Sequence, residues 1–230
     1  ATRATSGTCI QSIAKCNPNF FGGSADLAGS NKSRITLGGD FRARDTHANN
    51  LHFGVREHAM GAICNGLSLH GGLIPFCATF LVFHDYMRPS VRLADIMHQP
   101  VIYVYTHDSV WLGEDGPTHQ PIEQIQAMRS MINVWVVRPA DANESAEAWK
   151  LALARTDGPT ALCLTRQGLE ILDRAIYGAA SGTQRGAYVL IDADGQPDVV
   201  LIGTGSEVGL ALSARDALAA EGIAARVVSM

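Results

Sequence analysis

A polar segment, Thr106–Pro121, carries the densest set of side chains that could do chemistry. It holds two histidines, three acids and two glycines within sixteen residues, and it directly follows an apolar run. An ordinary turn-rich loop can have such a composition, but this density of titratable groups at a strand end favours a polar substrate pocket. A zinc site of His107, Asp115 and His119 is a weaker alternative, because no HxxxH or CxxC spacing supports it.

An acid at position 57 is the second candidate. The segment Gly54–Gly61 leads from a short apolar run into a helical pattern, and such junctions line ligand crevices in parallel sheets. The simpler interpretation of Glu57 is a first-turn acid that complements the helix dipole and pairs with Arg56. A catalytic interpretation requires Glu57 to be buried against an apolar ring, where it can share a proton with a ring nitrogen.

Three aromatic residues, Phe80, Phe83 and Tyr86, follow another apolar run at spacings of three. Aromatics at this spacing are more often core residues, but these lie past the carboxyl end of a predicted strand. We therefore expect them to hold a flat heterocycle by stacking and edge contacts. Arg166 also follows a strand and suits a phosphate or carboxylate, with an ion pair to a neighbouring acid as the equal alternative.

One glycine-rich segment resembles a cofactor motif without completing it. Residues 203–208, Gly-Thr-Gly-Ser-Glu-Val, follow a predicted strand and begin a predicted helix, as a dinucleotide-binding loop does. Val208 stands where the third glycine of that fingerprint belongs. We therefore do not expect this segment to bind a dinucleotide.

The elements that must position these residues alternate along the chain. Short apolar runs alternate with helical patterns, which predicts an α/β fold, a mostly parallel sheet with helices on both faces. The run at 101–105 is almost entirely apolar or aromatic, as expected for a central strand. Strands are predicted at 20–22, 51–53, 73–79, 101–106, 134–137 and 160–164, and helices at 6–16, 55–70, 83–97, 121–130 and 141–155.

The chain divides into unequal parts. Residues 1–170 are predicted to form the first domain, and the irregular, polar residues 171–186 a linker. Residues 187–230 carry patterns for three strands and one helix, which suffice for a βαβ crossover but not for a complete domain. We therefore expect this second α/β domain to be incomplete, and the chain to be a piece of a larger protein or one subunit of a split assembly.

Composition excludes several classes of function. The 230 residues are 47% hydrophobic and 17% charged, with a net charge of −4, so no footprint for nucleic acid or an anionic membrane is visible. The longest apolar run, Leu73–Phe83, is too short to span a bilayer. The first seven residues have no apolar stretch typical of a signal peptide, and the five cysteines form no CxxC pair. A reduced, cytoplasmic protein is expected.

The motifs together resemble the transketolase family. They run in the family's order and spacing through nearly the whole chain, at residues 22–27, 54–57, 80–86, 106–109, 113–121 and 165–167. The resemblance implies a thiamine-diphosphate pyrimidine-binding domain followed by the start of the family's C-terminal domain. It also implies transfer of a two-carbon ketol unit from a ketose phosphate to an aldose phosphate, in a site formed at a dimer interface.

The resemblance implies a role for each matching residue. Glu57 is similar to the glutamate that hydrogen-bonds the aminopyrimidine of thiamine diphosphate and so controls proton removal from the reacting carbon. Phe80, Phe83 and Tyr86 look like the pyrimidine pocket. His107 and His119 look like the remaining catalytic residues, with His119 near the reacting carbon.

The implied substrate contacts come from the whole first domain. Sugar hydroxyls would be contacted by His107 and Asp115, and Asp26 would lie near the cofactor or the substrate channel. The sugar-phosphate grip implied by the resemblance consists of Arg3, Ser30, His107 and Arg166.

The sequence departs from the family in two places. The family's diphosphate-binding domain, whose Gly-Asp-Gly motif and asparagine hold Mg²⁺ (or Ca²⁺), has no counterpart, since Gly38-Gly39-Asp40 is followed by Phe41. We therefore expect that half from a partner chain or domain, in a dimer or heterotetramer, and an inactive chain in isolation. Trp111 replaces a small residue, and could narrow the substrate entrance or pack against a partner chain.

Three other functions remain as alternatives. Two are enzymes of the same architecture, a dihydroxyacetone synthase or the β-type subunit of a 2-oxoacid dehydrogenase. The third is a non-catalytic module that retains the fold. Binding of the sugar phosphate by Arg166 would distinguish transketolase from the two other enzymes. Proton transfer that depends on Glu57 would distinguish it from the non-catalytic module.

Overall fold

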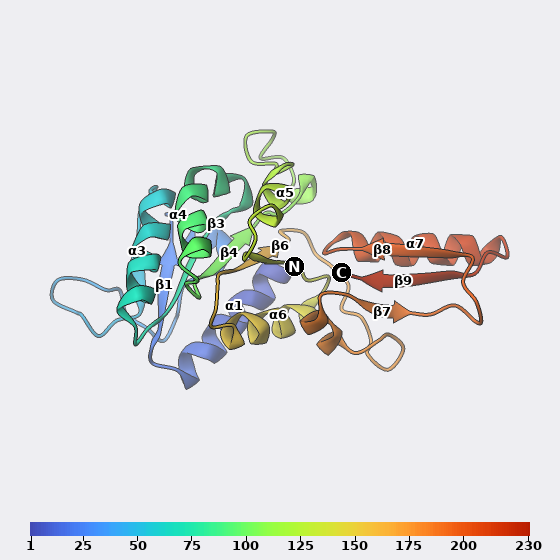
Figure 1. Ribbon diagram of the computed structural model, residues 1–230, viewed down its shortest axis with the longest axis horizontal. Helices are drawn as coiled ribbons and strands as arrows, with labels where there is room; N and C mark the ends of the chain where they lie inside the picture. The colour runs from blue at the N-terminus through green and yellow to red at the C-terminus, as the bar shows by residue number, and fades with distance from the viewer.

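The computed structural model describes residues 1–230 and contains two sheets (Figure 1). The larger sheet has six strands in the order β2-β1-β3-β4-β6-β5, and all neighbouring strands are parallel. The carboxyl ends of its strands therefore meet along one edge. The strands are β1 (Phe20–Ser24), β2 (Asn50–His52), β3 (Ile74–Phe80), β4 (Ile102–Thr106), β5 (Trp135–Val137) and β6 (Thr160–Leu164).

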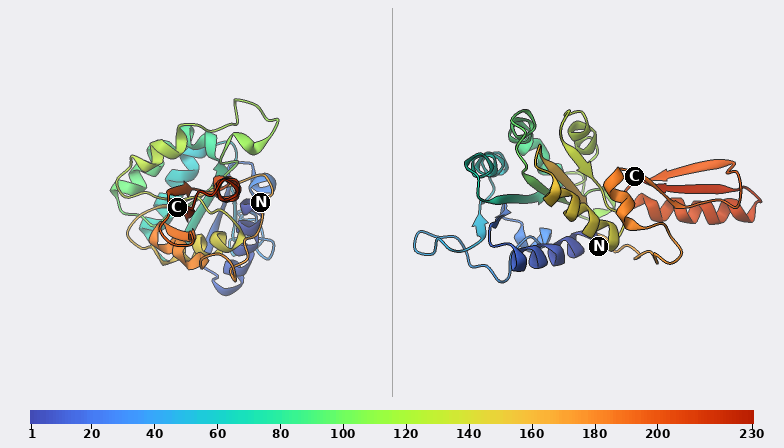
Figure 2. Two further views of the ribbon diagram at one scale, coloured as in Figure 1. Left: turned by 90° about the vertical axis from the view of Figure 1, so that its right-hand side faces the viewer. Right: turned by 60° about the horizontal axis from the view of Figure 1, so that its bottom comes forward.

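Helices cover both faces of this sheet, as Figure 2 shows. One face carries α3 (Glu57–His70), α4 (His84–Ile96) and α5 (Gln124–Arg129). The other face carries α1 (Thr2–Cys16) and α6 (Ala142–Ala154). A short helix, α2 (Ala28–Asn31), follows β1.

The central strand β4 shows how the sequence separates these two cores. Alternate side chains of a strand point to opposite faces. Ile102 and Val104 pack in the core under α1 and α6, whereas Tyr103 and Tyr105 pack under α3 and α4. Because both faces are covered, all five residues of the strand are buried.

Residues 188–230 form a second, smaller α/β unit, here called the small module, which extends to one side in Figure 1. Its three strands pair in the order β7-β9-β8, with β7 antiparallel and β8 parallel to β9. They are β7 (Tyr188–Ile191), β8 (Val199–Gly203) and β9 (Ala225–Ser229), with α7 (Glu207–Ala220) packed on them. The apolar core of the small module includes Leu190, Val208 and Val227, and Ala140 and Leu172 from outside the module also belong to it.

The predicted α/β class is confirmed, and the differences from prediction are local. The first helix begins at Thr2 rather than position 6, because the Thr2 backbone N–H donates to Thr165 Oγ1 across the fold (3.2 Å). The helix predicted at 121–130 begins only at Gln124, whose side chain accepts the Ile122 N–H (2.9 Å). The predicted linker contains a 3₁₀ turn at Ala180–Arg185.

The amino-terminal cap predicted for α6 is present. Asp141 Oδ1 accepts the backbone N–H of Glu144 at 2.8 Å, and Glu144 Oε2 accepts the N–H of Ala140 at 2.7 Å. Two otherwise unpaired backbone donors are thereby satisfied at a buried helix end. None of the helices combines the length and the apolar character needed to cross a bilayer.

Candidate functional site

The predicted site residues lie along the carboxyl edge of the larger sheet. Asp26 follows β1, Glu57 follows β2, Phe80 ends β3, His107 follows β4 and Arg166 follows β6. The strand order therefore arranges them along the edge as Glu57, Asp26, Phe80, His107 and Arg166. The sequence motifs predicted this shared edge for Glu57, Phe80, His107 and Arg166, since each follows an apolar strand, whereas Asp26 was expected only from the family resemblance.

An aromatic cluster occupies the middle of the edge. The rings of Phe80 and Phe83 are stacked, with their centroids 5.9 Å apart, and the centroid of the Tyr86 ring lies 6.0 Å from that of Phe83. Two histidines of the polar loop pack against these rings. The centroid of the His107 ring lies 3.7 Å from that of Phe80, and the centroid of the His119 ring lies 5.4 Å from that of Phe83, edge to face. The three aromatics and the two histidines therefore form one group, with Tyr86 65% exposed at its outer side.

His107 is held in an unusual conformation. Its φ of 60° lies in the left-handed region, which a residue with a side chain occupies only when its surroundings enforce it. Its Nδ1 lies 2.9 Å from Thr106 Oγ1, and its Nε2 lies 3.4 Å from Arg3 Nη1. Because an arginine can only donate, Nε2 is the acceptor, and the proton of the neutral ring sits on Nδ1.

Electrostatics keep the His107 ring neutral. Burial and the nearby Arg3 cation lower its pKa from 6.5 to about 4; Arg166 and His119 act in the same direction, and Asp115 opposes them. At neutral pH the ring is therefore a hydrogen-bonding group and not a cation.

A cationic group lies next to His107. Arg3 Nη1 donates to the backbone carbonyl of Ser30 at 2.8 Å. Burial and the neighbouring Arg166 lower the pKa of Arg3, while Asp115 raises it. The glycine at 113 lies against Arg166, since a Cβ there would meet Arg166 Nη1 at 3.2 Å. Two neighbouring arginines suit an anionic ligand.

Glu57 is the first residue of α3 and is only 7% exposed. Its carboxylate makes no side-chain hydrogen bond or ion pair within the chain, and Arg56 donates instead to the Phe53 carbonyl (3.2 Å). The simpler expectation of an Arg56–Glu57 pair is therefore wrong. Neither carboxylate oxygen is fully buried, so the unpaired carboxylate of this largely buried residue is available to a bound group.

Glu57 and Asp26 are not joined to the histidine group by any hydrogen bond. Asp26, with a φ of 61°, lines a separate cavity of about 240 Å³ with Gly54. This cavity lies at the β1–β2 end of the edge, next to the strand that precedes Glu57.

The structure also contains positioning contacts that sequence reasoning missed. Ser24 Oγ donates to Asn31 Oδ1 (2.6 Å), and Asn31 Nδ2 donates to Thr106 Oγ1 (2.9 Å), which contacts His107. Asn31 is separated from Thr106 by 75 positions, so no local pattern signals the contact. This buried network fixes the end of β4 and with it the His107 ring.

Neither candidate metal motif gathers a metal-binding group. No three His, Cys, Asp or Glu side chains lie close enough to hold an ion, His107, Asp115 and His119 included. Asp40 instead pairs with Arg34 at 2.8 Å and with His52 at 2.9 Å. These contacts lower the pKa of Asp40 to about 2.

The fold and the edge site define an α/β domain that presents aromatic, acidic and cationic side chains at the carboxyl ends of a parallel sheet, where such folds bind ligands. The family described as "Transketolase, pyrimidine binding domain" matches residues 1–170, and the "Transketolase-like TK C-terminal domain" matches residues 186–230. The chain belongs to the transketolase family, which confirms the resemblance seen in the sequence.

Known relatives are similar over the whole chain. The transketolase of Geobacillus stearothermophilus is 57% identical over 231 residues, covering 100% of this chain and 35% of that protein. A solved transketolase from Leishmania mexicana is 46% identical, with a TM-score of 0.96, 100% of this chain covered and 34% of the other. A solved chain described as "Split gene transketolase, inactive beta4 tetramer" is 30% identical, with a TM-score of 0.77 and coverages of 100% and 71%. The chain thus spans about a third of the curated relatives.

Proposed function

We propose that these residues supply the pyrimidine-binding half of a thiamine-diphosphate site that transfers a two-carbon ketol unit from a ketose phosphate to an aldose phosphate. The observation that carries the proposal is Glu57, a largely buried residue whose carboxylate has no partner, on the edge that bears the aromatic cluster. In this proposal residues 1–170 form the pyrimidine-binding domain, residues 171–186 the linker and residues 187–230 the start of the C-terminal domain.

The residues present fit the pyrimidine ring of thiamine diphosphate. Phe80 and Phe83 stack on each other, and Tyr86, beside them, is 65% exposed and offers its ring to a ligand. Flat heterocycles bind against such rings by offset stacking and edge contacts. The unpaired carboxylate of Glu57 adds a proton acceptor or donor for a ring nitrogen.

Bound thiamine diphosphate supplies an acidic carbon and an electron sink for breaking the ketose carbon–carbon bond. Glu57 would hold a proton at the pyrimidine nitrogen, and the aromatic rings would exclude water around it. His107, neutral at pH 7 because its pKa is about 4, would accept or donate hydrogen bonds to sugar hydroxyls together with Asp115 and His119.

The cationic group fits the phosphate of the sugar. Arg3 and Arg166 lie beside His107, and Arg3 is fixed by the Ser30 carbonyl. Guanidinium groups match phosphate oxygens in geometry and charge. We therefore assign sugar phosphates, with Asp26 nearer the cofactor, as the ligands of this edge.

The diphosphate and its Mg²⁺ are proposed to be held by residues outside these 230, on another chain or another part of the protein. The similarity to a solved split-gene transketolase, described as an inactive β4 tetramer, supports a division of the site of this kind. We propose a dimer or heterotetramer as the active assembly and no turnover by residues 1–230 alone.

Glu57→Gln tests the proposal in an assembly reconstituted with the diphosphate-binding half. It removes the proton exchanged at residue 57 and keeps the size of the side chain. We expect deuterium exchange at the reacting carbon of thiamine diphosphate, followed by NMR, to slow by about 10²- to 10⁴-fold, the usual size of a general acid–base contribution. Circular dichroism checks that the fold is retained.

Glu221→Gln is the matched control, because it makes the same change at an exposed position beyond α7. It should exchange at the rate of the unmodified assembly. Unchanged exchange in Glu57→Gln would remove the proton role of Glu57, and turnover by residues 1–230 alone would contradict the divided site.

A further inference from the structure

The glycine-rich segment Gly203–Glu207 binds a side chain of the first domain. Arg138 directly follows β5, and its Nη1 donates to the Thr204 carbonyl at 2.8 Å. Its Nη1 also contacts the carboxylate of Glu207, and Nη2 donates to Ser206 Oγ at 3.1 Å. The loop that resembles a dinucleotide fingerprint is therefore filled by a guanidinium group.

Gly205 makes this contact possible. Its φ is 59°, and a Cβ at this position would lie 2.6 Å from Arg138 Cγ. A side chain would thus be strained by the backbone and would also displace the arginine. The glycine, which a nucleotide loop would use for phosphate, serves here to admit Arg138.

The other side of Arg138 reaches the candidate active site. Its Nε donates to Asp108 Oδ2 at 2.7 Å, and this is the only ion pair of Asp108. Both side chains are nearly inaccessible, with 7% of Arg138 and 0% of Asp108 exposed. The second oxygen of Asp108 is buried without a partner, so its position depends on the arginine.

Asp108 is the residue after His107, whose φ of 60° must be enforced by its neighbours. On one side of His107 the backbone is held by Thr106, which is paired in β4. On the other side it is held by Asp108, which is bonded to Arg138. We propose that Arg138 is a positioning residue, which couples the Gly203–Glu207 loop of the small module to the conformation of His107. The role of His107 in substrate binding rests on the proposed function, but the coupling between the loop and His107 does not.

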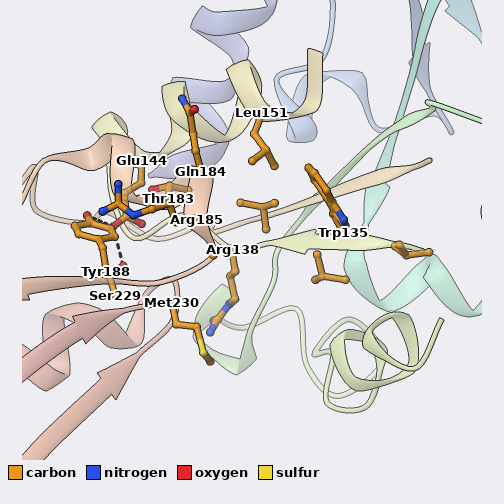
Figure 3. Close-up of a pocket in the computed structure, with 14 residues that line it drawn as sticks. Trp135, Arg138, Glu144, Leu151, Thr183, Gln184, Arg185, Tyr188, Ser229 and Met230 are labelled. Atoms are coloured by element: carbon orange, nitrogen blue, oxygen red, sulfur yellow. Dashed lines mark hydrogen bonds between the residues drawn. The ribbon is translucent and has the colours of Figure 1, made fainter. Parts of the chain in front are cut away.

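The two parts of the molecule also touch elsewhere, since Ala140 lies in the apolar core of the small module, but a cavity lies between them. A cavity of about 440 Å³ separates β5 and α6 from the turn at 183–186 and the ends of β7 and β9 (Figure 3). A second set of hydrogen bonds connects the first domain to the small module. Glu144 Oε1 accepts from Tyr188 Oη at 2.6 Å and from Ser229 Oγ at 2.7 Å. The small module therefore stays attached when the Arg138 contacts are changed.

Gly205→Ala in the full 230-residue chain tests the coupling. We expect the His107 ring, followed by an NMR pH titration and assigned with His107→Asn, to titrate about one pH unit closer to 6.5, since a shift of this size follows an ordinary change of environment. Arg138→Lys should shift it in the same direction, because one ammonium keeps a charge near Asp108 but cannot reach all four partners.

Gly209→Ala is the control, because Gly209 lies four positions further along the chain, in α7, with nothing within 4 Å of the added Cβ. It should leave the His107 titration unchanged. The charged groups around His107 are the same in all variants, so the shift reports its position; they are Arg3, Asp115, His119 and Arg166.

A lower unfolding midpoint in Gly205→Ala and Arg138→Lys with an unchanged His107 titration would overturn the proposal, because Arg138 would then be structural only. The readout needs no cofactor or partner. It therefore gives an answer even if the Glu57→Gln experiment contradicts the proposed function, and the two failures are distinguishable.

Discussion

A buried histidine makes the stability of this chain sensitive to acid. His84, at the start of α4, is fully buried, and its Nδ1 lies 2.8 Å from Tyr105 Oη, while its Nε2 has no partner. The pKa of His84 is lowered from 6.5 to about 4, mainly by burial. The nearby Asp85 carboxylate raises the pKa, and the Arg88 cation lowers it. The ring is therefore neutral in the folded chain at any pH above this value.

The sign and size of the effect follow from the two pKa values. The unfolded chain takes up a proton at His84 near pH 6.5, whereas the folded chain does so only near pH 4. The stabilisation is thus complete above pH 6.5 and is lost as the pH falls toward 4. Between about pH 7.5 and pH 5 the free energy of unfolding should fall by about 2 kcal/mol through this residue.

His84→Gln removes the titration and keeps a polar group near Tyr105. Urea unfolding at both pH values should show a pH-dependent loss about 2 kcal/mol smaller for His84→Gln than for the unmodified chain. His70→Gln, at the exposed end of α3, should behave like the unmodified chain. Equal losses in His84→Gln and the unmodified chain would refute the argument that burial excludes the proton.

Three further predictions concern packing and binding. Gly22→Ala places a Cβ against the backbone of β3 and should lower the free energy of unfolding by about 3 kcal/mol. Gly29→Ala, which adds a Cβ in open space, should change it by less than about 1 kcal/mol. Thermal denaturation measures both. Ser6→Ala removes the acceptor of the buried Trp149 indole N–H (2.9 Å) and should cost about 1–3 kcal/mol in urea unfolding. Arg166→Ala in the reconstituted assembly should raise KM for a phosphorylated sugar by about tenfold or more, and little for an unphosphorylated one. An unchanged KM would favour a dihydroxyacetone synthase or a 2-oxoacid dehydrogenase subunit.

The sheet could be predicted because its signals are local. The runs at 101–106 and 160–164 became β4 and β6, which lie in the interior of the sheet and are buried on both faces. The cap at Asp141 could be predicted for the same reason, since Asp141 and Glu144, only three positions apart, decide it. The start of the first helix could not, because Thr2 bonds to Thr165, which lies 163 positions away.

The candidate site could be predicted as an edge but not as a set of contacts. Apolar strands indicated that Glu57, Phe80 and His107 share the carboxyl end of a sheet. The left-handed backbone of His107 and its contact with Arg3 leave no periodic trace, because each depends on polar residues far apart in the chain. The same holds for Arg138, whose partners follow strands of two different sheets.

The order of the strands limits the size of the molecules that the edge can serve. Four strand spacings separate β2 from β6, which is roughly 19 Å at about 4.8 Å per step. The acid after β2 and the guanidinium after β6 are therefore too distant to touch one small sugar at the same time. In the proposed function, a ligand bound at Glu57 and a ligand bound at Arg166 would meet near the middle of the row, where the rings and imidazoles lie, and the reacting atoms would belong at that meeting point.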